Sequence, residues 1–156
     1  ALIGHGAVPP DAAAAAGLDA AEARRHLRDR LRTLHRQVLR DGQRFDTLDA
    51  DARHRVRKRL KRLRYLADFA APLFRSKAAA RYLARLRPVQ DALGRFNDEA
   101  VALALYRACT AQDPRAWFAV GWLQARHEAA GGEAQRALRR LRRKAVPFWT
   151  RKRADR

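Results

Sequence analysis

The sequence predicts an all-α protein, an antiparallel helical bundle of about four to six helices. Three observations predict this class. Apolar residues recur along most of the chain at the spacing of one helix face. No stretch of useful length alternates apolar and polar residues as a β-strand does. Glycine, proline and capping residues divide the chain into segments joined by short loops, which favours antiparallel neighbours.

Residues 1–18 are predicted to be a linker or a frayed lead-in, and residues 19–156 to be the helical bundle. The lead-in contains glycines, a Pro-Pro pair and a run of five alanines before Gly17. The chain contains no methionine, even at position 1, so we interpret it as a piece of a longer protein.

A first helix is predicted over about residues 20–40. Asp19 followed by Glu22 has the form of a capping box, and Gly42 is expected to act as the C-terminal cap. The apolar stripe of this helix consists of Leu27, Leu31, Leu34 and Val38. A row of cations lies beside the stripe: Arg25, Arg28, Arg32 and Arg36.

The second predicted helix begins at a cap, Asp49 or Asp51, and ends before Pro72. It contains residues 53–65, in which eight of thirteen side chains are Lys or Arg and none is acidic. Its apolar face is predicted to consist of Val56, Leu60, Leu63, Ala67 and Ala70. The opposite face carries His54, Arg57, Lys58, Lys61, Arg64 and Tyr65. The segment is therefore predicted to be anchored to a core while it presents an ordered row of cations.

A third helix is predicted to start at Ser76, with Pro88 and Gly94 kinking or interrupting it. Asn97 or Asp98 is then expected to cap a separate helix from Glu99 to about Cys109.

The next predicted helix follows Asp113-Pro114 and stops at Gly131-Gly132. Its aromatic residues, Trp117, Phe118 and Trp122, are predicted to lie in the core. A last basic helix is predicted over about residues 133–144, before Pro147. We interpret its cations as a solvated face rather than as a binding site.

The net charge of +19 indicates a polyanionic partner: nucleic acid, an anionic surface or a phosphate polymer. The excess of arginine suits bidentate phosphate contacts, and it also fits a GC-rich genome. No apolar run is long enough to span a membrane, and no signal peptide is recognisable, so a cytoplasmic location without membrane association is expected.

The sequence gives no indication of an enzyme. It has no P-loop motif, its 16 acidic residues are scattered, and Cys and His do not occur at zinc-site spacing. We therefore expect no catalytic residues, no metal and no cofactor.

Two motifs resemble the signatures of the CHAD family, the helical domain named for its conserved histidine. The first is His54-x-x-Arg57-Lys58-x-x-Lys61-Arg62-x-Arg64-Tyr65, and the second is Gln90-Asp91-x-Leu93-Gly94-x-x-Asn97-Asp98. The Gly121-Trp122 pair also fits the family pattern. The resemblance is strongest over residues 20–130 and corresponds to the C-terminal half of the domain, with a single His-basic signature.

The resemblance implies binding of inorganic polyphosphate in a basic channel and association with polyphosphate granules. It also implies a partner outside this fragment, either a second CHAD half or a fused CYTH-type domain. Cations at regular spacing on rigid helices are what a phosphate chain requires. The predicted polyphosphate-binding residues are His54, Arg57, Lys58, Lys61, Arg62, Arg64 and Tyr65, with Arg25, Arg28, Arg32 and Arg36 as a facing wall.

Several alternatives stay open at this point. Tyr65 is expected either to lie at the edge of the core or to add a phenolic donor. Gln90, Asp91, Asn97 and Asp98 are expected to bond backbone groups near Pro88 and Gly94, or, for the two aspartates, to orient an arginine. The alternative function is a basic helical domain that binds nucleic acid without sequence specificity.

Overall fold

The computed structural model describes residues 20–74 and 76–150, and over this part of the chain the fold is all-α without strands, as predicted. The four α-helices are α2 (Ala20–Gly42), α3 (Ala50–Ala70), α4 (Ser76–Cys109) and α5 (Ala116–Lys144). Short 3-10 helices, Phe45–Thr47 and Ala71–Leu73, lie in the first two connections. The predicted lead-in and the Asp19 cap lie outside the described residues.

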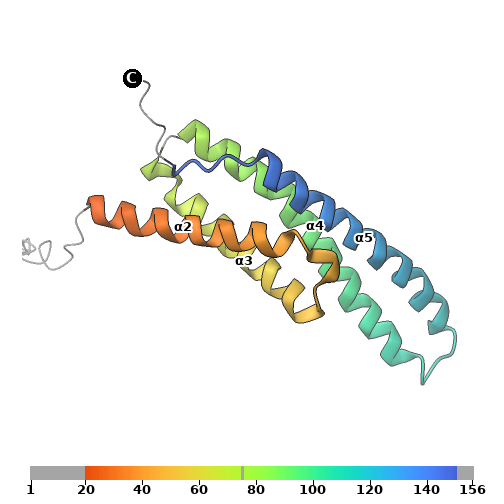
Figure 1. Ribbon diagram of the computed structural model, residues 1–156. Helices are drawn as coiled ribbons and strands as arrows, with labels where there is room; N and C mark the ends of the chain where they lie inside the picture. Colours follow the sequence, from red (N-terminus) through yellow and green to blue (C-terminus); the bar gives the residue numbers. More distant parts are fainter. Residues whose placement is uncertain (1–19, 75, 151–156) are drawn as a thin grey trace, which may run out of the picture.

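Consecutive helices run in opposite directions, and the bundle closes because α2 packs against both α3 and α5, while α4 packs against α3 and α5 (Figure 1). All four helices contribute buried residues to one main core. The seam between α3 and α4 therefore lies opposite the seam between α2 and α5.

Local signals explain where two of the helices begin. Asp49 is the N-cap of α3, and its Oδ1 accepts a hydrogen bond from Ala52 N at 2.6 Å. Asp113 Oδ1 accepts from Arg115 N at 3.0 Å in the turn that leads into α5, which begins at Ala116, just after the predicted Pro114 start.

Gly42 ends α2 as predicted, but for a different reason. No described glycine has a positive φ, so Gly42 is not a left-handed cap. A Cβ at this position would lie 2.9 Å from Leu138 Cδ2 on α5. The glycine is needed because α5 approaches the end of α2 so closely.

The predicted interruption of α4 is wrong, because the helix runs through Pro88 and Gly94 without a break. Leu86, Val89 and Leu93 are all buried in the main core on the two sides of the proline. Tertiary packing therefore outweighs the local preference against helix. Pro88 itself is exposed, so water can satisfy the carbonyl that lacks its helical donor.

The predicted break at Gly131-Gly132 is also wrong, since α5 continues from Ala116 to Lys144. Ala130 and Ala134 are buried on the two sides of the glycines and hold both halves of the helix to the core. A Cβ at Gly131 would contact the Phe96 ring at 3.4 Å, which indicates close packing against α4 at this point.

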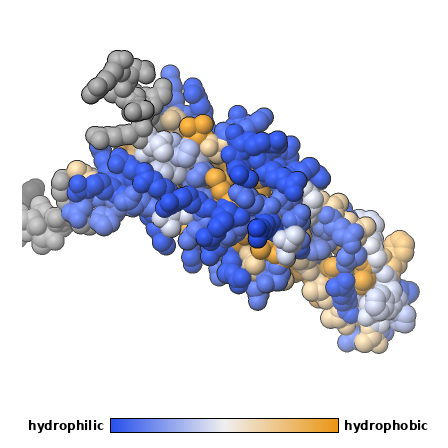
Figure 2. Space-filling view, in the orientation of Figure 1, coloured by the Kyte–Doolittle hydropathy of each residue, from blue (hydrophilic) through white to orange (hydrophobic). Residues whose placement is uncertain are grey.

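The aromatic residues at the start of α5 are exposed, contrary to the prediction. Trp117, Phe118 and Trp122 are 62%, 85% and 56% exposed. The far ends of α4 and α5 extend beyond α2 and α3 as a two-helix hairpin, so no other helix of the described chain covers them (Figure 1). Apolar atoms gather at this end of the molecule, whereas the four-helix part is largely hydrophilic on the same face (Figure 2).

Candidate phosphate-binding surface on α3

Helix α3 has the orientation that its sequence predicts. Val56, Leu60 and Leu63 are at most 1% exposed, and Ala67 and Ala70 complete the buried stripe. These apolar contacts along the helix therefore fix its rotation about its axis. The cations of residues 53–65 must then lie on the sides and the outer face.

Two arginines of this segment have structural partners. Arg53 donates to the carbonyl oxygens of Phe45 and Asp46 at 3.1 and 2.8 Å and also lies over the Phe45 ring. Arg59 pairs with Asp41 of α2. Both side chains tie α3 to its neighbours, so we do not count them among the candidate ligand residues.

The other cations of the segment make no hydrogen bond or ion pair with any described residue. They are Arg55, Arg57, Lys58, Lys61, Arg62 and Arg64. His54 at the start of the row is exposed. Tyr65 is 54% exposed, so it does not belong to the core edge, and Lys61 Nζ lies 5.7 Å from the centroid of its ring.

The two sequence motifs meet across a groove between α3 and α4. Its volume is about 410 Å³. From α3 it is lined by Arg57, Lys61 and Tyr65. The α4 wall consists mainly of residues of the second motif and one further cation: Gln90, Asp91, Leu93, Gly94, Arg95 and Asp98.

A smaller hollow of about 240 Å³ adjoins this groove and shares Arg57 with it. His54 and Arg57 line it from α3, Asn97 from α4 and His127 from α5. The histidine of the first motif and the asparagine of the second thus lie at the same hollow. The Phe96 ring stacks on His127 with a centroid distance of 4.3 Å.

The polar residues of the second motif do not have the roles first expected of them. The helix is regular around Pro88 and Gly94, and neither Asp91 nor Asp98 makes an ion pair with a described arginine. Gln90 Oε1 in the groove and His127 Nδ1 at the hollow are buried without a hydrogen-bond partner. Such atoms are uncommon in proteins, and their burial means that a ligand does not reach them in this conformation.

The arginine row of α2 does not form the facing wall of this groove. None of Arg25, Arg28, Arg32 and Arg36 lines either hollow that contains Arg57, because the facing wall is α4. Lys58, Arg62 and Arg64 of α3 also lie outside the linings of both hollows. They are placed to contact only a ligand that extends beyond the groove along the helix.

Two residues of the site were missed by sequence reasoning. Arg95 follows Gly94 in the second motif, lines the groove, and donates to Glu133 Oε2 at 2.9 Å. Its position within the second motif could have indicated that it belongs to the site. His127 lies far along the chain in α5, and no sequence pattern connects it with His54.

The described residues contain no group of three His, Cys, Asp or Glu side chains arranged to hold a metal ion. None of the helices in this part of the chain is long and apolar enough to cross a membrane.

The fold and the site define a basic helical bundle. One of its helices buries its apolar face in the core and presents an ordered, largely unpaired row of cations on its other side. A family model described as CHAD domain matches residues 3–107, which is more than half of the chain. The chain belongs to the CHAD-domain family. The matched range includes both motifs and ends within α4, so that Gly121-Trp122 and all of α5 follow it. No curated protein and no solved structure matches the chain.

Proposed function

We propose that this chain is a non-catalytic module that binds inorganic polyphosphate along the exposed cation row of α3. The proposal is based on the lack of partners for the cations of that row. The apolar face of α3 is fully buried. Six cations between residues 55 and 64 have no hydrogen-bonding or ionic partner among the described residues. Membership of the CHAD-domain family, which is consistent with polyphosphate binding, supports the same function.

The chemistry of the row suits a linear phosphate polymer. Arg57 and Lys61 are one helical turn apart, so their charges repeat along the helix at about 6 Å. Arginine donates in a planar fork and lysine acts as a compact charge, and both form charge-assisted hydrogen bonds with phosphate oxygens. His54 and Tyr65 add donors at the two ends of this part of the row.

The carboxylates of Asp91 and Asp98 restrict where the polymer runs. Both line the α4 wall of the groove, where they repel phosphate. We therefore place the chain of phosphates on the α3 side of the groove, over Arg57, Lys61 and Arg64. Association with polyphosphate granules in the cytoplasm is part of the same proposal.

A competition titration tests the proposal. Labelled long-chain polyphosphate is competed by duplex DNA, heparin and short polyphosphate at equal charge concentration, in about 150 mM salt, where screening weakens loose attraction. We expect polyphosphate to compete best. Equal competition by all polyanions would instead favour non-specific nucleic-acid binding, for which the net charge of +19 is sufficient.

A charge-matched pair of variants locates the site. In the α3 variant, Arg57, Lys58 and Lys61 are replaced by Gln. In the control variant, the exposed residues Arg24, Arg30 and Lys77, which line none of the grooves described, are replaced by Gln. Both variants lose three charges. We expect the α3 variant to lose polyphosphate affinity by tenfold or more, on the order of 1.4 kcal/mol, and the control to lose little.

A further inference from the structure

A second strongly basic groove lies on the opposite seam of the bundle, between the end of α2 and the last turns of α5. Its volume is about 880 Å³. Six arginines line it, and the remaining lining residues, Leu39, Gly42, Gln43 and Leu138, include no carboxylate. The six arginines are Arg44, Arg136, Arg139, Arg140, Arg142 and Arg143. We call this feature the arginine groove.

The walls of the arginine groove are held in place by buried contacts. Leu138 packs directly against Gly42. The amide of Gln135, which is 5% exposed, donates to the carbonyls of Gly42 and Gln43 at 3.3 and 3.2 Å. Its Oε1 accepts from Asp46 N at 3.1 Å. The groove is therefore a fixed feature of the α2–α5 seam, formed before any ligand binds.

Some arginines elsewhere in the described chain have a carboxylate partner, whereas the arginines of this groove do not. Arg59, Arg95, Arg115 and Arg126, for example, each form an ion pair with a carboxylate. None of the six guanidinium groups in the groove forms a hydrogen bond or an ion pair with a described residue. Like charges gathered without counter-charges repel one another, and a bound anion would relieve that repulsion.

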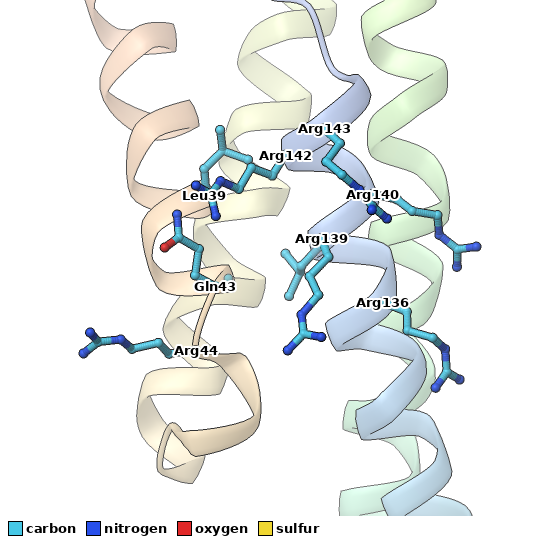
Figure 3. A pocket seen from close by; sticks show the side chains of 10 residues that line it. Leu39, Gln43, Arg44, Arg136, Arg139, Arg140, Arg142 and Arg143 are labelled. Carbon is cyan, nitrogen blue, oxygen red and sulfur yellow. The ribbon is translucent and has the colours of Figure 1, made fainter.

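The directions of the side chains identify the inner part of the groove. The Arg142 side chain reaches across from α5 toward Leu39 of α2, and the Arg139 guanidinium lies between the two helices (Figure 3). Arg44 points outward from the α2 side, and Arg136 and Arg140 extend along the other side of α5 (Figure 3). Arg139 and Arg142 therefore form the inner contacts, with Arg143 one position further along α5.

We infer that the arginine groove is a second phosphate-chain site, so that one molecule holds polyphosphate on two opposite seams of the bundle. Forked donors one helical turn apart, with no carboxylate in the lining of the groove, suit closely spaced phosphate groups. The part of the inference that names polyphosphate rests on the proposed function of α3. The arginine groove is formed by other residues, all of which lie before the first family motif or after the second.

Two sites on opposite seams make the protein bivalent toward a long polymer. A helix is about 10 Å across, so the two seams are separated by roughly the width of two helices. Tripolyphosphate is too short to span that width and must occupy each site separately. A long chain can wrap around one molecule or join two molecules, and either mode raises the apparent affinity.

The test uses the whole chain and tripolyphosphate as the probe, by calorimetric titration at about 150 mM salt. We expect two sites in the unaltered protein. In the α5 variant, Arg139, Arg142 and Arg143 are replaced by Gln, and we expect one site. All three residues are exposed and Gln is a good helix former, so circular dichroism should be unchanged. The Arg24, Arg30 and Lys77 variant is the charge-matched control and should retain two sites.

Retention of the unaltered stoichiometry in the α5 variant would overturn the inference. The α3 variant tests the proposed function separately, because its loss of one site does not depend on residues 139–143. Long-chain polyphosphate supplies a second readout. Light scattering of mixed protein and polymer should fall in the α5 variant, and apparent affinity should drop by about tenfold or more. Scattering equal to that of the control variant would also contradict bivalency.

Discussion

His35 Nδ1 lies 2.8 Å from the Tyr82 hydroxyl, and this hydrogen-bonded pair joins α2 to α4 inside the core. Trp149, which follows α5, packs its ring against both partners at centroid distances of 5.7 and 4.9 Å. Burial lowers the pKa of His35 from its ordinary value of 6.5 and raises that of Tyr82. Both groups are therefore neutral in the folded protein near neutral pH.

The buried histidine predicts that stability falls in mild acid. Well above pH 6.5 neither the folded nor the unfolded chain protonates this side chain appreciably. Below pH 6.5 the unfolded chain binds a proton that the folded chain binds less readily, so the free energy of unfolding decreases as the pH falls. One such group contributes a slope of at most about 1.4 kcal/mol per pH unit. Urea denaturation at several pH values from about 8 to about 5 measures it.

His35→Gln is the matched variant for this prediction, because Gln is neutral throughout and can still bond Tyr82. The two proteins share every other titratable residue, so the difference between the two curves isolates His35. We expect the two free energies to converge as the pH falls below 6.5. Parallel curves over the whole range would show that burial of His35 does not control acid stability.

Two glycine substitutions should have opposite effects on stability. Gly42→Ala places a Cβ 2.9 Å from Leu138 Cδ2, so the Leu138 side chain or the two helices must shift, at a cost of about 1–3 kcal/mol. Gly121→Ala meets no atom within 4 Å on an exposed part of α5. Alanine should stabilise the helix there by about 0.5–1 kcal/mol. Thermal unfolding of both variants measures the difference, and a loss of stability in Gly121→Ala would contradict the described helix.

The α4–α5 hairpin should open locally before the four-helix part unfolds. Its own cluster contains only three buried residues in the described chain, Leu103, Val120 and Leu123, whereas the main core draws on all four helices. Local opening requires less free energy where fewer apolar contacts are lost. Hydrogen exchange should be faster for amides near Val120 than for those near Leu138. Equal protection at the two places would show that the hairpin does not open independently.

The sequence predicted helix α3 well because its apolar stripe, its cap and its cations are all local features. Val56, Leu60 and Leu63 indicate which face is buried, and Asp49 determines where the helix begins. The breaks in α4 and α5 were predicted wrongly because Pro88 and the two glycines are local signals against helix. Packing of Leu86 and Val89 on a shared core outweighs them.

The rest of the site depends on contacts that the sequence does not encode locally. Asp91 and Arg57 belong to different motifs, and only the packing of α3 on α4 brings both to one groove. The arginine groove requires the close approach of Leu138 to Gly42, far apart in the chain. Trp117 and Phe118 were predicted to be buried because they are apolar. Whether such residues are covered depends on the length of the neighbouring helices.

Gln135 should be a strong determinant of stability, because its amide serves three backbone groups near the end of α2. Gln135→Leu keeps the size of the side chain but leaves Asp46 N, Gly42 O and Gln43 O without this partner. Unpaired buried polar groups typically cost about 1–3 kcal/mol each, so we expect a loss of at least about 1 kcal/mol. Gln37→Leu on α2 is the control, since Gln37 is half-buried and its side chain has no hydrogen bond with a described residue. Urea midpoints compare the two variants, and a Gln135→Leu protein as stable as the Gln37→Leu protein would show that the amide does not hold the α2–α5 seam.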